Sequence, residues 1–207
     1  ILAIRQNLQS QGLDSGAQTI WFHLNGKYGA APAVSTIWRC LRQHGLVVPD
    51  PSKKPKAYLQ RFEADFPNET WQSDFTHVRL ASGADIEILN FLDDHSRFLV
   101  SCKAHRPVTG MKVIQDFTAA IKEFGPPQST LTDNGSVFTA RFVKGKNGFE
   151  HLLDSLGIVQ KNSSPNHPQT QGKIERFHQT LKKWLASRPP ARNLAELQKL
   201  LDEFRFV

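Results

Sequence analysis

Residues 163–185, SSPNHPQTQGKIERFHQTLKKWL, join a polar stretch to an amphipathic one that carries a single carboxylate. The first half is rich in Pro, Asn, Gln and Gly, which predicts a loop. Apolar residues of the second half recur every three or four positions and predict a helix: Ile174, Phe177, Leu181 and Trp184. A second stripe flanks this apolar face: Gln171, Glu175, His178 and Lys182. Glu175 is therefore expected at the rim of a core and among basic residues, which points to metal or proton chemistry on a polyanion.

The composition indicates a soluble, globular protein with an anionic partner. The chain has 207 residues, 39% of them hydrophobic, which suffices for one ordinary domain and a small second one. Its net charge of +7 favours nucleic acid. Cys40 and Cys102 lie far apart without CxxC spacing, so a thiolate zinc site and a disulfide framework are not expected, and a reducing cytoplasm is. The sequence has no apolar run of membrane-spanning length.

Residues 1–48 predict a small helical domain, with helices at 1–9, 17–24 and 34–41. A Gly- and Pro-containing break at residues 25–32 precedes the third helix. Polar residues of this helix suit contacts in a DNA major groove: Ser35, Thr36, Arg39 and Arg42. We therefore predict a helix-turn-helix DNA-binding domain, with a plain three-helix packing module as the alternative.

Residues 49–68 are rich in proline and lysine and predict a stiff, basic linker. From residue 69 to residue 207 the pattern predicts an α/β domain with a mixed sheet. Strands at 71–78, 86–92 and 97–102 should form an antiparallel meander, followed by short strands at 129–132 and 158–160. Helices are predicted between and after them, and the last begins at Asn193, with Glu196 completing a capping box.

Three carboxylates occupy places where this topology can gather them. Asp74 lies in the first strand, Asp133 follows the fourth strand, and Glu175 lies on the later helix. A fourth strand parallel to the first would place the aspartates side by side, with the helix bringing Glu175 over them. Three oxygen ligands without sulfur suit Mg²⁺ or Mn²⁺. Two such ions could activate a water or a 3′ hydroxyl and stabilise the leaving oxygen of a phosphodiester. Taken singly, each acid is more often a turn or surface residue, and Asp93 and Asp94 are interpreted as turn residues.

Four segments resemble the DDE transposases and integrases of bacterial insertion sequences, which share a retroviral-integrase-like catalytic core. They are WQSDFTHV at 71–78, LDDHSRFLVS at 92–101, LTDNGSVF at 131–138 and SPNHPQTQGKIERFHQTLK at 164–182. The resemblance runs from about residue 61 to residue 204. It implies a ribonuclease H-like fold with five strands, Mg²⁺-dependent DNA cleavage and strand transfer, and action as a homodimer or larger multimer on transposon ends.

The resemblance also implies roles for residues at matching positions. Asp74, Asp133 and Glu175 would be the catalytic metal ligands. Asn134 and Gln171 would shape the site at which DNA binds. The basic residues that would contact the DNA phosphates are Lys173, Arg176 and Lys182. The retroviral His/Cys zinc module is absent, which favours the bacterial branch, and the family's usual continuation after the last helix is missing, so we expect a C-terminally truncated chain.

The sequence therefore predicts a transposase of the bacterial cytoplasm, associated with the nucleoid, that hydrolyses a phosphodiester and then transfers the strand. Two alternatives stay open: a non-catalytic DNA-binding scaffold that keeps the fold, and a metal-dependent nuclease that cuts without joining.

Overall fold

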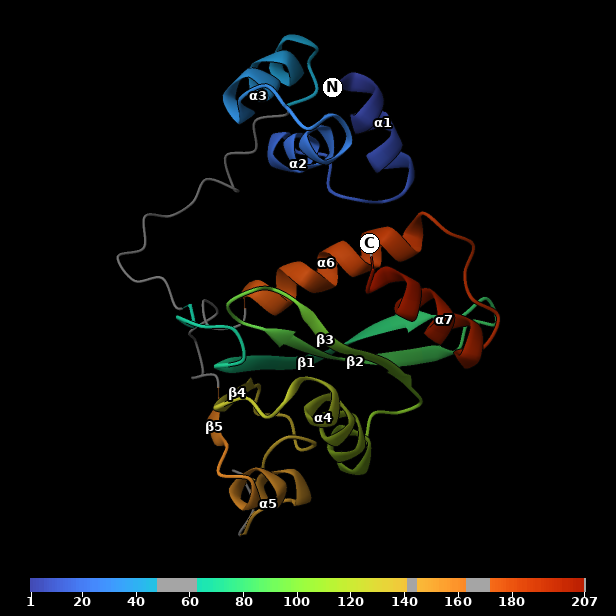
Figure 1. Ribbon diagram of the computed structural model, residues 1–207. Helices are drawn as coiled ribbons and strands as arrows, with labels where there is room; N and C mark the ends of the chain where they lie inside the picture. The colour runs from blue at the N-terminus through green and yellow to red at the C-terminus, as the bar shows by residue number, and fades with distance from the viewer. Residues whose placement is uncertain (48–62, 141–144, 163–171, 207) are drawn as a thin grey trace. The chain divides into compact units, whose positions relative to one another are not determined.

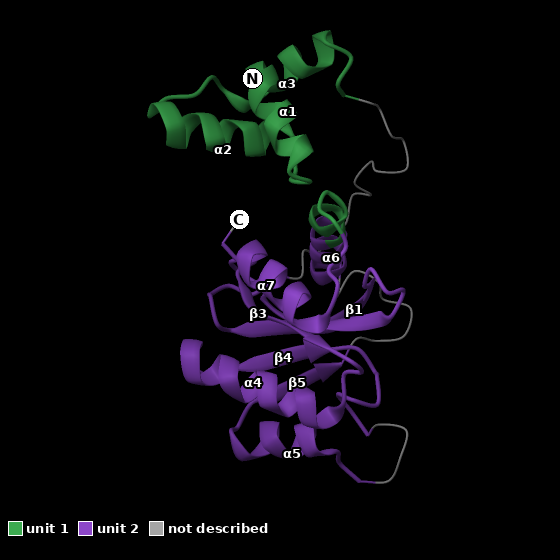
Figure 2. Ribbon diagram, turned by 90° about the vertical axis from the view of Figure 1, so that its right-hand side faces the viewer, with its two compact units in different colours: residues 1–61, 182–189 green, residues 62–181, 190–207 purple. Residues whose placement is uncertain are grey.

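The computed structural model describes residues 1–47, 63–140, 145–162 and 172–206. The chain divides into two compact units, drawn in different colours in Figure 2. Unit 1 comprises residues 1–61 and 182–189, and unit 2 comprises residues 62–181 and 190–207. Most of the predicted linker, the predicted loop at 163–171 and Gln171 itself lie outside the described residues.

Unit 1 contains three N-terminal helices, α1 (Leu2–Ser10), α2 (Ala17–Tyr28) and α3 (Val34–Gln43). They close over a small apolar core of Leu8, Ile20, Ile37 and Leu41. The break between the second and third helices was predicted to begin at Asn25. This starting position was wrong, because α2 continues for another turn. It ends at Gly29, whose positive φ of 70° lets its N–H bond the carbonyl of Asn25, a conformation that glycine adopts without strain.

Unit 2 is built on a five-stranded mixed sheet in the order β3-β2-β1-β4-β5, which confirms the predicted ribonuclease H-like fold (Figure 1). The strands are β1 (Thr70–Arg79), β2 (Asp85–Asp93), β3 (Leu99–His105), β4 (Ser129–Thr132) and β5 (Val159–Asn162). The first three form the predicted antiparallel meander. β4 pairs parallel with β1 on one side and with β5 on the other.

Helices cover both faces of this sheet (Figure 1). α4 (Gly110–Phe124) and α5 (Gly148–Ser155) lie on one face, and α6 (Gly172–Ala186) and α7 (Leu194–Phe204) lie on the other. The core beneath α4 and α5 is aromatic. The ring centroid of Phe117 lies within 5.6 Å of the ring centroids of Trp71, Phe91 and Phe149. Within the described residues, no helix combines the length and the apolar character needed to cross a membrane.

The start of α7 differs from the prediction in one respect. Asn193 accepts the N–H of Glu196 as expected, but the Glu196 carboxylate accepts the N–H of Arg192 instead of returning to Asn193. A complete capping box forms at α5, between Asn147 and Glu150. Both helices nevertheless begin with a side chain that satisfies an otherwise unpaired amide.

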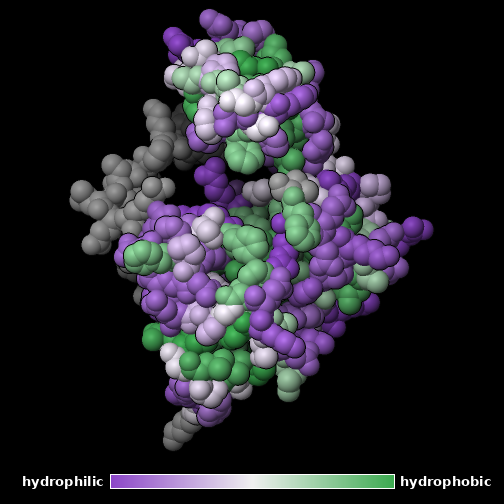
Figure 3. Space-filling model, viewed as in Figure 1, coloured by the Kyte–Doolittle hydropathy of each residue, from purple (hydrophilic) through white to green (hydrophobic). Residues whose placement is uncertain are grey.

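The face of the molecule drawn in Figure 3 is mostly polar. In Figure 3 hydrophilic residues dominate the visible face, with apolar residues in small groups between them. Such a surface agrees with a charged protein whose apolar residues are largely used in its cores.

We expect Phe117→Ala to destabilise the protein by about 3–5 kcal/mol, because the ring is completely buried and its loss leaves a cavity among three aromatic neighbours. Urea unfolding followed by circular dichroism measures the change. Met111→Ala, on the same helix but 63% exposed, is the control and should shift the free energy of unfolding by less than about 0.5 kcal/mol. Equal effects of the two substitutions would contradict this packing.

Candidate active site

Asp74 lies in the middle of β1, at the centre of the sheet. It is directly opposite Asn90 of β2 in the antiparallel pair. Its Oδ1 accepts the N–H of Phe75 at 2.8 Å, and 22% of its side chain is exposed. Asp74 therefore presents a partly buried carboxylate with one oxygen already oriented by the backbone.

Asp133 follows β4 directly, and the strand pairing brings it beside β1. Ser73 pairs with Thr132, so Asp74 and Asp133 continue two neighbouring parallel strands. The Oδ1 of Asp133 accepts the N–H of Gly135 at 2.9 Å. A Cβ at Gly135 would lie only 2.9 Å from that oxygen, so glycine leaves the space that the carboxylate occupies. The turn that the sequence predicted here thus also holds the Asp133 side chain in place.

Glu175 lies in the first turn of α6 and is exposed. The pKa of the neighbouring Asp74 is raised from its usual 3.8 to about 6. Burial is the largest cause, the N–H of Phe75 opposes it, and the negative charges of Asp133 and Glu175 raise the pKa further. The three acids therefore share one electrostatic neighbourhood. Even so, among the described residues no three His, Cys, Asp or Glu side chains form a compact metal-binding group.

His178, one turn after Glu175, connects α6 to the sheet. It is 8% exposed, and its Nε2 lies 3.0 Å from Nδ2 of Asn90. Because the Asn90 amide also donates to the carbonyl of Ile88, we assign Nε2 as the acceptor and place the imidazole proton on Nδ1. That nitrogen lies 3.8 Å from Oδ2 of Asp74. The sequence predicted that His178 and Glu175 share one stripe of the helix. It did not predict the contacts of His178 with Asn90 and Asp74, because no motif surrounds Asn90.

The structure places the four predicted DNA-binding residues of α3 on its exposed side. Ser35, Thr36, Arg39 and Arg42 are exposed, whereas Ile37 and Leu41 of the same helix are buried. The Arg39 guanidinium donates to Oγ1 of Thr36 at 3.3 Å, and that of Arg42 lies 5.4 Å from the ring centroid of Trp38. These positions follow the helical repeat and leave one polar face open to solvent.

The other predicted contact residues are distributed around α6 and β4. Asn134 is half-buried beside Asp133, and Arg176 and Lys182 are exposed on α6. Lys173 differs from them, because its ammonium lies 2.7 Å from a carboxylate oxygen of Asp94 and only 16% of its side chain is exposed.

Comparisons with known proteins agree with this fold. The integrase core domain family matches residues 64–168, and a second description of the integrase core domain matches residues 156–206. The chain is 29% identical over 136 residues to the Gag-Pro-Pol polyprotein of Human T-cell leukemia virus 3, covering 66% of this chain and 9% of the polyprotein. It is also 29% identical over 145 residues to the insertion element IS407 uncharacterized 31.7 kDa protein of Burkholderia multivorans, covering 69% of this chain and 50% of that protein.

A solved structure supports the fold independently. A chain of the simian T-cell lymphotropic virus intasome in complex with PP2A regulatory subunit B56 gamma aligns with a TM-score of 0.56 at 23% identity. The alignment covers 88% of this chain and 62% of that chain. The chain thus spans no more than half the length of the two curated relatives named above.

The raised pKa of Asp74 predicts a pH-dependent stability of the metal-free protein. The folded state binds the proton more tightly, so the contribution of Asp74 to stability is complete below pH 3.8 and is lost as the pH rises through about 6. With a chelator present, Asp74→Asn should therefore be more stable than the wild type at pH 7.5, by about 2 kcal/mol after allowance for partial exposure. The difference should shrink as the pH falls toward 4.

Urea unfolding at a series of pH values measures this difference. Asp65→Asn, which removes an exposed carboxylate from the same unit, serves as the control and should show a difference below about 0.5 kcal/mol throughout. A difference for Asp74→Asn that does not vary with pH would contradict the assigned cause.

Proposed function

The chain belongs to the integrase core domain family, and on this basis we propose that it is a DNA transposase of a bacterial insertion sequence. It would bind the ends of its element, hydrolyse a phosphodiester there, and join the freed strand to target DNA. The insertion element relative from Burkholderia multivorans supports the bacterial assignment.

The observation that carries this proposal is the gathering of acids around Asp74 in a chain of net charge +7. Burial is the main cause of the raised pKa of Asp74, and the negative charges of Asp133 and Glu175, which come from separate elements of the fold, raise it further. Like charges held near one another disfavour the folded state, so they call for a functional explanation. A divalent cation bound among them would balance these charges.

The donor set fits Mg²⁺ or Mn²⁺. Asp74, Asp133 and Glu175 would supply carboxylate oxygens, the ligands that these hard cations prefer. The two aspartates are already oriented by the amides of Phe75 and Gly135, while the exposed Glu175 side chain is free to turn toward them. When bound, two such ions supply an activated water or 3′ hydroxyl and stabilise the leaving oxygen.

The other residues position the DNA and the carboxylates. His178 places its Nδ1 3.8 Å from Oδ2 of Asp74, so it would help to position that carboxylate electrostatically. Arg176 and Lys182 would contact phosphates, and Asn134 and Gln171 would shape the site. Because water and then a 3′ hydroxyl act as nucleophiles, the proposed reaction forms no covalent bond between the protein and DNA.

DNA binding before the reaction is assigned to the N-terminal helices. The exposed polar face of α3 carries two arginines and no acid, which suits entry into a major groove. Joining two ends would also require more than one protomer, so we propose a homodimer or larger homo-oligomer. Its substrate would place the protein in the bacterial cytoplasm, at the nucleoid.

The decisive experiment is a cleavage and joining assay on supercoiled DNA that contains the ends of the element, with Mg²⁺ or Mn²⁺. We expect metal-dependent joined products, and Glu175→Gln should reduce them roughly 100-fold or more, since even residues that only support metal ligands contribute 10–100-fold. Glu203→Gln, an exposed acid on α7, is the control and should retain activity. Nicking without joining would indicate a nuclease, and DNA binding without either reaction would indicate a scaffold.

Arg39→Ala tests the DNA-binding role of α3. If the residue reads a base edge, the substitution should weaken binding to an element end by about 1–3 kcal/mol and have little effect on unrelated DNA. Fluorescence anisotropy at fixed salt measures both affinities. Lys122→Ala removes an exposed lysine from α4 and serves as the matched control for the loss of a positive charge. Equal affinities of wild type and Arg39→Ala for the element end would favour a plain packing module.

A further inference from the structure

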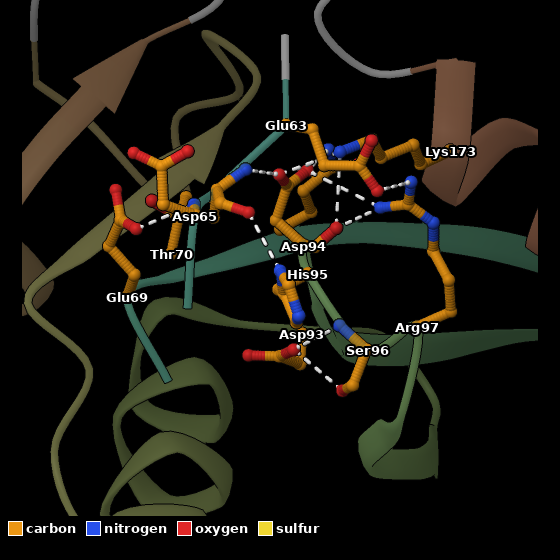
Figure 4. Close-up of polar contacts among 12 residues, drawn as sticks. Glu63, Asp65, Glu69, Thr70, Asp93, Asp94, His95, Ser96, Arg97 and Lys173 are labelled. Carbon is orange, nitrogen blue, oxygen red and sulfur yellow. Dashed lines mark hydrogen bonds and ion pairs between the residues drawn. The ribbon is translucent and has the colours of Figure 1, made fainter. Parts of the chain in front are cut away.

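Asp94 immediately follows β2 and joins three other parts of unit 2 through one buried carboxylate. It is 6% exposed. Its Oδ1 accepts from Nε2 of Gln72 at 2.6 Å, and its Oδ2 accepts from Nζ of Lys173 at 2.7 Å and from the N–H of Ala64 at 2.6 Å. Figure 4 shows Lys173 reaching Asp94 from α6. One side chain in the turn between β2 and β3 thus holds the segment before β1, β1 itself and the first turn of α6.

Gln72 uses both ends of its amide in this arrangement. Its Oε1 accepts the N–H of Ile174 at 3.2 Å. Because the Asp94 carboxylate can only accept, it requires the NH₂ of Gln72, which turns Oε1 toward α6. Ile174 belongs to the first turn of α6, where amides have no partner inside the helix. A strand side chain therefore performs the task of a helix cap.

The position of Gln72 links this contact to the candidate active site. Gln72 and Asp74 are two residues apart in β1 and share one face of the sheet. Ile174 immediately precedes Glu175. The contacts of Gln72 and Asp94 therefore connect the backbone beside one proposed metal ligand to the strand that carries another.

We propose that Asp94 and Gln72 are positioning residues, which hold the start of α6 so that Glu175 stays in register with Asp74. The importance of this register for catalysis rests on the proposed function. In this arrangement Lys173 is the cation that docks α6 and not a phosphate contact. Its Nζ also donates to the backbone carbonyl of Asp94 at 3.1 Å, so both acceptors of its ammonium among the described residues belong to Asp94.

The same contacts also fit a purely structural role, since breaking a buried ion pair is destabilising, even though Nη1 of Arg97 also lies 3.9 Å from Oδ1 of Asp94. A positioning role makes a different prediction about the metal. Misplacing Glu175 should weaken metal binding while the fold and DNA affinity persist. The test therefore compares metal affinity, helix protection and DNA binding in the same variants.

The experiment uses Asp94→Asn, Lys173→Met and the double variant of the whole chain, with Mn²⁺ as the probe. Isothermal titration should show roughly 10–100-fold weaker Mn²⁺ binding in each single variant, in line with losses of supporting residues at metal sites. The double variant should be no weaker than the worse single variant, because the two residues act as one pair. Hydrogen exchange at the amide of Ile174 should become about ten-fold faster or more in all three.

Lys103→Met is the matched control, because it removes a lysine from an exposed ion pair with Asp202 in the same unit. It should change neither Mn²⁺ affinity nor exchange at Ile174. Lys173→Arg should restore most of the Mn²⁺ affinity, since it keeps the positive charge beside Asp94. If Asp94→Asn fails to fold, Lys173→Met and Lys173→Arg still give the comparison.

Two results would overturn the inference. One is unchanged Mn²⁺ affinity and unchanged exchange at Ile174 in Lys173→Met. The other concerns DNA binding and the slope of log affinity against log salt concentration. A slope that is smaller by about one in Lys173→Met alone would make Lys173 a phosphate contact. Failure of the proposed function is distinguishable, because it appears as a wild type that neither cuts nor joins DNA, whereas exchange at Ile174 reports docking without any reaction.

Discussion

The parallel pairing of β1 with β4 is the constraint on which the candidate site depends. Its register, with Ser73 opposite Thr132, places Asp74 and Asp133 on neighbouring strands although α4 and two further strands separate them in the chain. A shift by one residue would turn the side chains of β4 to the other face and displace the end of the strand. The register is secured by the apolar core beneath α4 and α5, above all by the aromatic residues around Phe117.

The site and the core have opposite effects on stability. Burial and like charges make an ionised Asp74 unfavourable, whereas the packing of Trp71 and Phe149 against Phe117 favours the folded state. β1 contributes to both, since Trp71 faces the core under α4 and Asp74 faces α6. A strand that must present acids on one face therefore needs strong apolar packing on the other.

The sequence predicted the fold well because its signals are local. Alternation and helical repeats predicted the strands and helices of unit 2, the short connections predicted the antiparallel meander, and the resemblance implied the ribonuclease H-like fold. Asp93 is the turn residue that was expected, as it accepts from the amides of Asn68 and Ser96. Asp94 is more than that, because it holds Gln72 and Lys173. No local pattern distinguishes these adjacent aspartates, and the role of Asp94 arises only from its contacts with distant segments of the chain, at Ala64, Gln72 and Lys173. The contact of His178 with Asp74 and Asn90 was missed for the same reason.

The three acids come from β1, the end of β4 and the start of α6, in that order along the chain. During synthesis the ribosome therefore releases Asp74 and Asp133 well before Glu175, and β1 cannot pair with β4 until α4 has been made. Domains of this kind fold as units once such distant segments are present. Under the proposed function, a nascent or partly degraded chain would contain some of the acids without the assembled site, which would protect the host chromosome from cleavage by unfinished protein.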